Sequence, residues 1–176
     1  MKFYRKILPD TNYLPKFITK KRLHEDEIDF DRLRSYRLDR VKKELAKRDI
    51  GACILFDPVN VRYALDTTNM SIYNMHNLTR YCFIPVNGPV ILYEYFNCEH
   101  LAKHLTLIDE IRLGITWDYF SVGDQVKNQL KKWTGEVQNL MNLHCGKNKR
   151  LAVDVSNGPG ILALNKIGLE IIEGKE

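Results

Sequence analysis

The feature that most constrains the fold is the dipeptide Asn87-Gly88, which stands between two β-rich runs, Tyr81 to Val86 and Val90 to Tyr95. This dipeptide readily adopts the positive φ angles of a tight turn, so the two runs are predicted to form a hairpin. Short apolar runs and helical patterns alternate on both sides of it. The other predicted elements are helices at 30–48, 58–65, 98–105, 126–141 and 158–167 and strands at 52–56, 110–113, 151–155 and 169–172. This alternation predicts an α/β fold, a single domain with a mixed β-sheet flanked by helices.

Residues 66–79 show neither a helical nor a strand period. Before them, the apolar run Ala52 to Leu55 leads to Asp57, a residue type that caps helices, and to Pro58, which suits the first helical position. The short helix predicted there ends near Leu65, and no period returns before Tyr81. Residues 66–79 are therefore predicted to be an irregular loop. Long irregular segments inside compact domains are usually functional or disordered.

The composition is sufficient for one domain. Of 176 residues, 44% are hydrophobic and 28% are charged, so a core can form without a second domain. Residues 1–29 contain two prolines and no sustained period and are predicted to be an extended arm, which leaves 30–176 as the α/β domain. The chain has no run of about 18 apolar residues and no apolar signal-peptide centre, so a cytoplasmic protein without a membrane span is expected. Its four cysteines show no CxxC spacing, and disulfides are not expected.

The net charge of +5 is concentrated at the front of the chain. Residues 1–50 carry 15 Lys and Arg against 9 Asp and Glu, and much of this surplus lies on the predicted helix 30–48. A solvated amphipathic helix accounts for it without a ligand. Nucleic-acid binding stays as a less favoured alternative, since the basic residues lack interleaved aromatics and match no recognition motif. Binding that weakens steeply with added salt would support that alternative.

The motifs of common catalytic and metal sites are absent from the sequence. Cys98, His100 and His104 form the one cluster worth weighing, because histidines four positions apart share a helical face. Cys98 points elsewhere on such a helix, and a fourth ligand is missing, so no metal site is predicted. A nucleophile elbow, a GxGxxG pattern and a phosphate loop are also absent. No catalytic residue is assigned within these 176 residues.

Several motifs resemble the amino-terminal domain of the creatinase/prolidase family, the pita-bread metalloenzymes. They are, in the expected order, RLRSYRLDRVKKEL, GACILFDPVNVRYALD, LAVDV and GPGILALNKIG. The resemblance runs from about Leu33 to the end of the chain. Within the family, the segment TTNMSIYNMHN looks most like the branch that contains dimethylsulfoniopropionate lyases.

The resemblance implies a division of labour between two domains. Family enzymes hold a pair of divalent metal ions on a carboxyl-terminal catalytic domain, through two aspartates, a histidine and two glutamates. No segment of residues 1–176 resembles that domain. The chain is therefore expected to be a non-catalytic amino-terminal domain whose partners are its own catalytic domain and a second protomer of a homodimer. The whole enzyme would be an Xaa-Pro peptidase, a creatinase-like hydrolase or a dimethylsulfoniopropionate lyase, acting on a small-molecule or peptide substrate. A stand-alone binding or scaffold module is the alternative.

The resemblance also implies which residues face the substrate. In the family, loops of one protomer's amino-terminal domain can overhang the active site of the other, and creatinase-like relatives use an arginine and an aromatic residue from this region. The substrate-facing candidates are Tyr73, His76, Asn77, Arg80 and Tyr95. The guanidinium of Arg80 could bind a substrate carboxylate, and the rings of Tyr73 and Tyr95 could attract a sulfonium cation. Relatives in the lyase branch tend to carry tryptophan where Tyr73 stands.

Overall fold

The computed structural model describes residues 28–175. Two compact units divide after Asp31, and the fold described below is that of the second unit. The predicted extended arm, residues 1–29, lies outside the described residues except for its last two positions, so it stays a prediction. Within residues 28–175, none of the helices combines the length and the apolar composition needed to cross a membrane.

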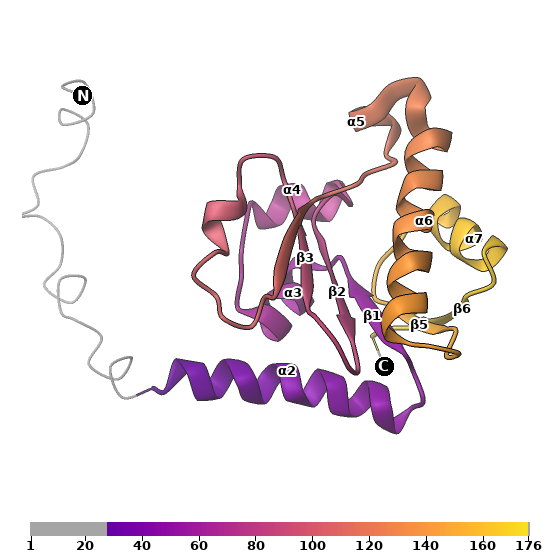
Figure 1. The fold of residues 1–176 in the computed structure, drawn as a ribbon. Helices are drawn as coiled ribbons and strands as arrows, with labels where there is room; N and C mark the ends of the chain where they lie inside the picture. The colour runs from indigo at the N-terminus through magenta and orange to yellow at the C-terminus, as the bar shows by residue number, and fades with distance from the viewer. Residues whose placement is uncertain (1–27, 176) are drawn as a thin grey trace, which may run out of the picture. The chain divides into compact units, whose positions relative to one another are not determined.

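The second unit is built on one six-stranded mixed sheet with the strand order β4-β3-β2-β1-β5-β6 (Figure 1). The strands are β1 (Ala52–Leu55), β2 (Tyr81–Pro85), β3 (Ile91–Glu94), β4 (Glu110–Leu113), β5 (Arg150–Val153) and β6 (Glu170–Glu173). Strand β2 runs antiparallel to both of its neighbours, and the other neighbouring pairs are parallel. The predicted hairpin is the pair β2 and β3, in which Tyr81 lies opposite Tyr93. The mixed sheet and the α/β class are confirmed.

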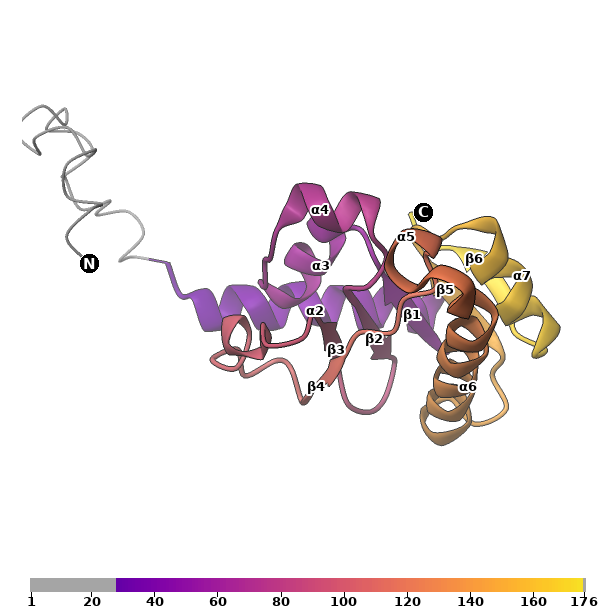
Figure 2. The same ribbon diagram turned by 90° about the horizontal axis from the view of Figure 1, so that it is seen from above.

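Helices cover both faces of this sheet, which can be followed from above in Figure 2. Helices α2 (Phe30–Lys47) and α3 (Pro58–Leu65) pack on one face, and α6 (Val126–His144) and α7 (Gly158–Lys166) pack on the other. Because side chains alternate along a strand, Tyr81 and Phe83 of β2 join the α6 side, whereas Cys82 and Ile84 join the α2 side. All residues of β1, β2 and β3 are consequently buried.

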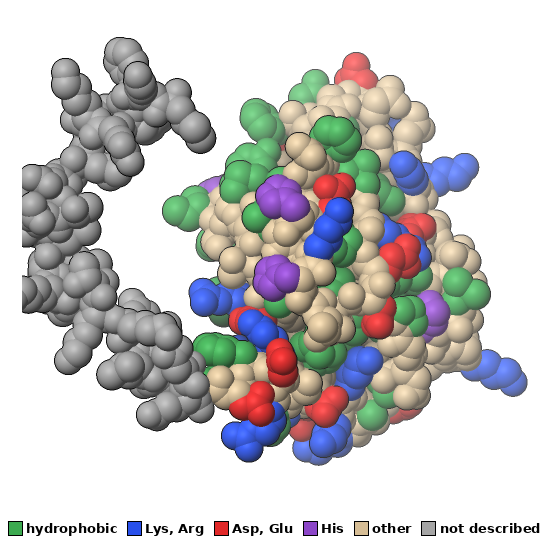
Figure 3. All heavy atoms as spheres, turned by 60° about the vertical axis from the view of Figure 1, so that its left-hand side comes forward, with side chains coloured by type: hydrophobic (Ala, Val, Ile, Leu, Met, Phe, Trp, Pro, Cys, Tyr) green, Lys and Arg blue, Asp and Glu red, His purple; other side chains and the backbone are tan. Residues whose placement is uncertain are grey.

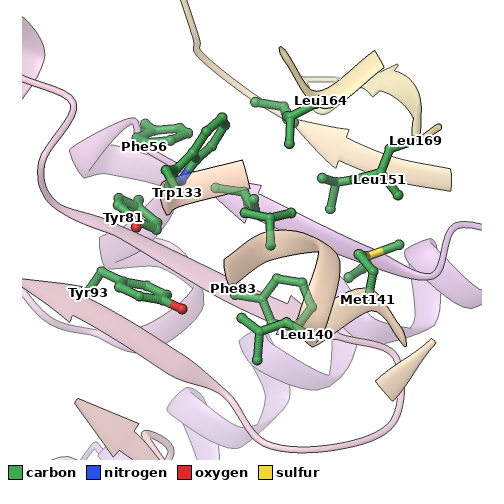
Figure 4. Close-up of a cluster of buried hydrophobic side chains, with 14 of the residues drawn as sticks. Phe56, Tyr81, Phe83, Tyr93, Trp133, Leu140, Met141, Leu151, Leu164 and Leu169 are labelled. Atoms are coloured by element: carbon green, nitrogen blue, oxygen red, sulfur yellow. The ribbon is translucent and has the colours of Figure 1, made fainter. Parts of the chain in front are cut away.

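An aromatic cluster fills the space between the sheet and α6 (Figure 4). The rings of Tyr81 and Tyr93 stack with their centroids 4.4 Å apart, and the ring centroids of Phe56 and Tyr81 are 4.9 Å apart. Trp133 of α6 is fully buried and packs on Trp117 with ring centroids 4.0 Å apart. Buried aromatic pairs of this kind contribute beyond the area they bury. The cluster therefore fixes α6 and the segment around Trp117 against the sheet.

The structure differs from the prediction in segments whose secondary structure does not follow from the spacing of apolar residues. The predicted loop 66–79 contains a helix, α4 (Ser71–His76), whose one buried residue is Asn74. The predicted helix 98–105 is wrong: only a 3-10 turn, η4 (Glu99–Leu101), forms there. Asn97, directly before this segment, has a φ of 61°, whereas a residue that caps a helix at its N-terminus has an extended backbone. The short helices α5 (Tyr119–Val122) and η5 (Gly123–Gln125) were not predicted.

Gly114, directly after β4, is expected to tolerate no side chain. An added Cβ would lie 2.2 Å from the carbonyl oxygen of Thr79. We expect Gly114→Ala to lower the free energy of unfolding by about 1–3 kcal/mol, because one of the two backbone segments must shift. Urea unfolding checks this, with Gly135→Ala as the control. Gly135 lies inside α6 with nothing within 4 Å of its added Cβ, so that variant should gain roughly 0.5–1 kcal/mol. Equal stability of the two variants would contradict the prediction.

Candidate functional site

The predicted substrate-facing residues lie around the open end of the β2–β3 hairpin, opposite its turn. Tyr81 begins β2 and lies opposite Tyr93 of β3, so the next residues outward, Arg80 and Glu94, are also neighbours. Helix α4 precedes Arg80 in the chain and lies beside this end of the hairpin (Figure 1). Tyr95 follows Glu94 directly, which places its ring next to α4.

A buried ion pair forms the base of this site. The side chains of Arg80 and Glu94 are 1% and 0% exposed, and Arg80 Nε lies 2.8 Å from Glu94 Oε2. The Arg80 guanidinium also donates to Thr67 Oγ1 at 3.0 Å. The other carboxylate oxygen of Glu94 accepts from the Asn69 side-chain amide at 3.0 Å and from the Tyr95 backbone N–H at 2.9 Å. The pair thus fastens the start of the α4 segment to the end of β3.

This geometry corrects the expectation that Arg80 binds a substrate carboxylate. Its guanidinium is enclosed in the domain and already engages a carboxylate, that of Glu94. A substrate could reach it only by separating a buried ion pair, which is strongly unfavourable. Through Glu94 and Thr67, Arg80 therefore links the segment before α4 to the end of β3.

Two buried asparagines fix α4 to its surroundings. Asn74 donates to the backbone carbonyl of Asn69 at 2.6 Å and accepts a hydrogen bond from the Tyr95 hydroxyl at 2.7 Å. Asn77 donates to the Tyr73 hydroxyl at 3.1 Å and to Ser121 Oγ at 3.0 Å, and its side-chain oxygen accepts from Thr79 Oγ1. Asn77 was predicted to face the substrate, and the structure places it 5% exposed, with its side-chain amide donating to the Tyr73 hydroxyl.

Tyr73 and Tyr95 form an aromatic pair at the surface. Their ring centroids lie 5.8 Å apart with an interplanar angle of 52°, and Tyr73 is 43% exposed. Burial, followed by the nearby Tyr73 and Glu94, raises the pKa of Tyr95 to about 12. Tyr95 is therefore a neutral hydrogen-bond donor at physiological pH. His76, the last residue of α4, is exposed. The accessible members of the predicted set are thus Tyr73 and His76, with Tyr95 half-buried behind Tyr73.

Sequence reasoning missed the residues that hold the site together. Glu94 carried a usable signal, because a carboxylate inside the apolar run ILYEY needs a cationic partner when both faces of the strand are covered. Asn69 and Asn74 belong to an asparagine-rich run whose inward members cannot be recognised from periodicity. Ser121 had no signal, since its contact with Asn77 joins segments far apart in the sequence.

Among the described residues there is no group of three or more His, Cys, Asp or Glu side chains that could hold a metal ion. His100 and His104 do not share the face of one helix, because η4 ends at Leu101.

A second polar cluster joins the carboxyl ends of β1 and β5. The buried carboxylate of Asp154 accepts from the backbone N–H groups of Phe56, Val155 and Asp57 at 2.8, 2.6 and 3.1 Å, and from the Asn60 side chain at 3.0 Å. Burial raises the pKa of the Asp154 carboxyl, and these donors oppose the rise. Because all four neighbours are donors, a proton on either oxygen would displace one of them. The cluster is therefore a structural link between the ends of β1 and β5.

Comparisons with known proteins agree with this fold. No family model matches the chain. It is 38% identical over 148 residues to dimethylsulfoniopropionate lyase DddP of Roseovarius nubinhibens and 34% identical over 148 residues to dimethylsulfoniopropionate lyase DddP of Roseobacter denitrificans. Each match covers 84% of this chain and 33% of the relative, so the chain spans about a third of the length of these curated relatives.

Among solved structures, the creatinase/prolidase N-terminal domain of an X-Pro dipeptidase from Streptococcus pyogenes is similar in fold. The TM-score is 0.52 at 14% sequence identity, and the alignment covers 78% of this chain and 98% of that domain. At this level of identity the likeness concerns the fold alone.

Proposed function

We propose that this chain is the non-catalytic amino-terminal part of a metal-dependent enzyme of the creatinase/prolidase family. Its fold is similar to that of a creatinase/prolidase N-terminal domain, and its sequence is similar to two dimethylsulfoniopropionate lyases. The observation that carries this proposal is the match of 84% of the chain to only 33% of each lyase. The remaining two thirds of such an enzyme would hold the metal ions and the groups that transfer protons. The amino-terminal domain would supply dimer contacts and substrate-facing residues.

The proposed substrate is a small molecule, with a sulfonium compound that bears a carboxylate as the first candidate. The names of the two relatives favour a lyase over the proline peptidases and creatinase-like hydrolases that share the fold. The exposed ring of Tyr73 suits the cationic end of such a substrate, since aromatic faces attract poorly hydrated cations by roughly 0.5–2 kcal/mol. With Arg80 paired internally, the substrate carboxylate would be bound by the catalytic domain. We place the enzyme in the cytoplasm as a homodimer.

The division of labour is tested by comparing the purified 176-residue chain with the longer polypeptide. Reading the gene past the codon for Glu176 first shows whether an open frame with two aspartates, a histidine and two glutamates in the family's arrangement follows. An immediate stop codon would favour the stand-alone module instead. Both proteins are then assayed with dimethylsulfoniopropionate and with Xaa-Pro dipeptides, with and without a chelator. Turnover should require the longer chain and be lost on chelation. Turnover by the 176-residue chain alone would overturn the proposal.

Tyr73→Ala in the longer enzyme is expected to raise KM for the sulfonium substrate by about 2- to 30-fold. This range is the loss of a cation–π contact of roughly 0.5–2 kcal/mol. Tyr73→Phe keeps the ring and loses only the hydrogen bond from Asn77, so its KM should stay close to that of the wild type. Tyr36→Ala, on the exposed surface of α2, is the control for removal of a tyrosine elsewhere. Steady-state kinetics decide, and an unchanged KM in Tyr73→Ala would exclude substrate contact by this ring.

A further inference from the structure

The tripeptide Asn-Gly-Pro occurs twice in the chain, at residues 87–89 and at residues 157–159. An asparagine followed by glycine loses its side-chain amide more readily than other asparagines, because glycine has no Cβ to hinder attack by its own backbone nitrogen. The first copy lies in the link between β2 and β3, and the second begins α7. Because the two copies share this chemistry, the fold decides which of them reacts.

The first copy is open to solvent. Asn87 and Gly88 are both exposed, and no group within residues 28–175 is hydrogen-bonded to the Asn87 side chain. Gly88 has a φ of 121°, and a Cβ added to it would lie 3.0 Å from Nδ1 of His144. Glycine is therefore required at position 88, and the side-chain amide of Asn87 is free to turn toward the Gly88 nitrogen.

The second copy is held by two hydrogen bonds. Asn157 caps α7, and its Oδ1 accepts from the backbone N–H of Gly160 at 2.9 Å and from Nε1 of Trp117 at 2.8 Å. Trp117 is buried, so losing this acceptor would leave a buried donor unpaired, which is unfavourable. Attack by the Gly158 nitrogen requires the Asn157 side chain to turn away from both donors. The cap therefore opposes the reaction.

We propose that Asn87 is a site of spontaneous deamidation in the folded protein and that Asn157 is protected by its capping contacts. The Gly88 nitrogen attacks Cγ of Asn87 and forms a bond to it, the bond from Cγ to Nδ2 breaks, and ammonia leaves with the proton from Gly88. Water then opens the cyclic imide at either carbonyl, which gives aspartate or isoaspartate. The reaction consumes one water molecule and needs no oxidant or reductant.

The surroundings of Asn87 can accept the product. The carbonyl oxygen of Gly88 accepts a hydrogen bond from Nζ of Lys42 in α2 at 3.4 Å. Helix α2 carries more Lys and Arg than Asp and Glu, and Figure 3 shows Lys and Arg side chains along the lower part of the molecule, where α2 lies. A new carboxylate at position 87 therefore lies beside a cationic helix. Isoaspartate lengthens the main chain in an exposed link rather than in a strand, so the modified chain stays folded and accumulates.

Peptide mapping by mass spectrometry tests this proposal on the 176-residue chain, incubated in one buffer with and without urea. In the folded chain, aspartate and isoaspartate should form at Asn87 about 10-fold or more faster than at Asn157, which must first give up two hydrogen bonds. In urea the two positions should convert at comparable rates, because the cap is lost. Asn87→Gln is the matched control: it keeps an amide but would have to close a larger ring, so the chain should keep its charge while Asn157 reacts as before.

Two results would overturn the inference. One is an Asn87 that stays intact in the folded chain over the time in which it converts in urea. The other is a folded chain in which Asn157 converts as fast as Asn87. Both readouts are rates of amide loss, so they are independent of turnover by the longer polypeptide, which tests the proposed enzyme function.

Discussion

Arg80→Ala is expected to destabilise the domain by about 3–5 kcal/mol, because it leaves the Glu94 carboxylate buried without its cation. Both side chains lie inside the domain, and their closest atoms are 2.8 Å apart. The variant would also remove the donor to Thr67 Oγ1. Urea unfolding of the 176-residue chain, followed by far-ultraviolet circular dichroism, measures the loss.

The double variant Arg80→Ala/Glu94→Ala separates the ion pair from simple loss of packing. Removing both charges avoids an unpaired buried ion, so the double variant should be more stable than the two single losses predict when added. The control is Lys47→Ala, since Lys47 lies 3.7 Å from Glu44 in an exposed pair that should contribute about 0–1 kcal/mol. A single Arg80→Ala variant that unfolds at the wild-type urea concentration would contradict the prediction that this buried pair stabilises the domain.

This ion pair connects two separate segments of the candidate site. Glu94 also accepts hydrogen bonds from Asn69 and from the backbone of Tyr95, so the pair connects the segment before α4 with the segment after β3. Tyr73 is then oriented through Asn77, and Tyr95 through Asn74. Of the polar residues predicted as ligands, Arg80 and Asn77 are buried, and their hydrogen bonds support the exposed ring of Tyr73.

The fold could be predicted because its local signals agree with its tertiary contacts. Asp57 caps α3 by accepting from Val59 N at 2.7 Å, as the sequence Asp-Pro predicts. The dipeptide Asn87-Gly88 correctly indicates the hairpin, and Gly88 has a φ of 121°. Burial on both faces then follows from the helical patterns on each side of the strands.

The candidate site was harder to predict from the sequence, because its helix α4 lacks the usual pattern of buried apolar residues. Helix α4 has no inward apolar stripe, so a search for periodicity returns a loop. The partner of Arg80 could have been found, since a hairpin that turns at Asn87-Gly88 and pairs Tyr81 with Tyr93 also brings Arg80 to Glu94. The contact of Ser121 with Asn77 could not have been predicted, because it depends on the path of the chain after β4.

Asp154→Ala is expected to cost about 3–5 kcal/mol of unfolding free energy, because it leaves several buried donors without an acceptor. Oδ1 accepts from Phe56 N and Val155 N, and Oδ2 accepts from Asp57 N and the Asn60 amide. These bonds join β1 and β5, a parallel pair with no shared turn, across more than ninety residues of sequence. The loss should therefore exceed that of an ordinary surface change.

Two milder variants make the reason for that loss testable. Asp154→Asn keeps one carbonyl oxygen for Phe56 and Val155 but presents an NH2 group to Asp57 N and Asn60, so about half of the loss is expected. Asn60→Ala removes a single donor and should cost about 1 kcal/mol. Hydrogen exchange at the Phe56 and Val155 amides should quicken in Asp154→Ala and stay slow in Asn60→Ala. Asp154→Asn as stable as the wild type would mean that packing, rather than the four accepted hydrogen bonds, joins β1 to β5.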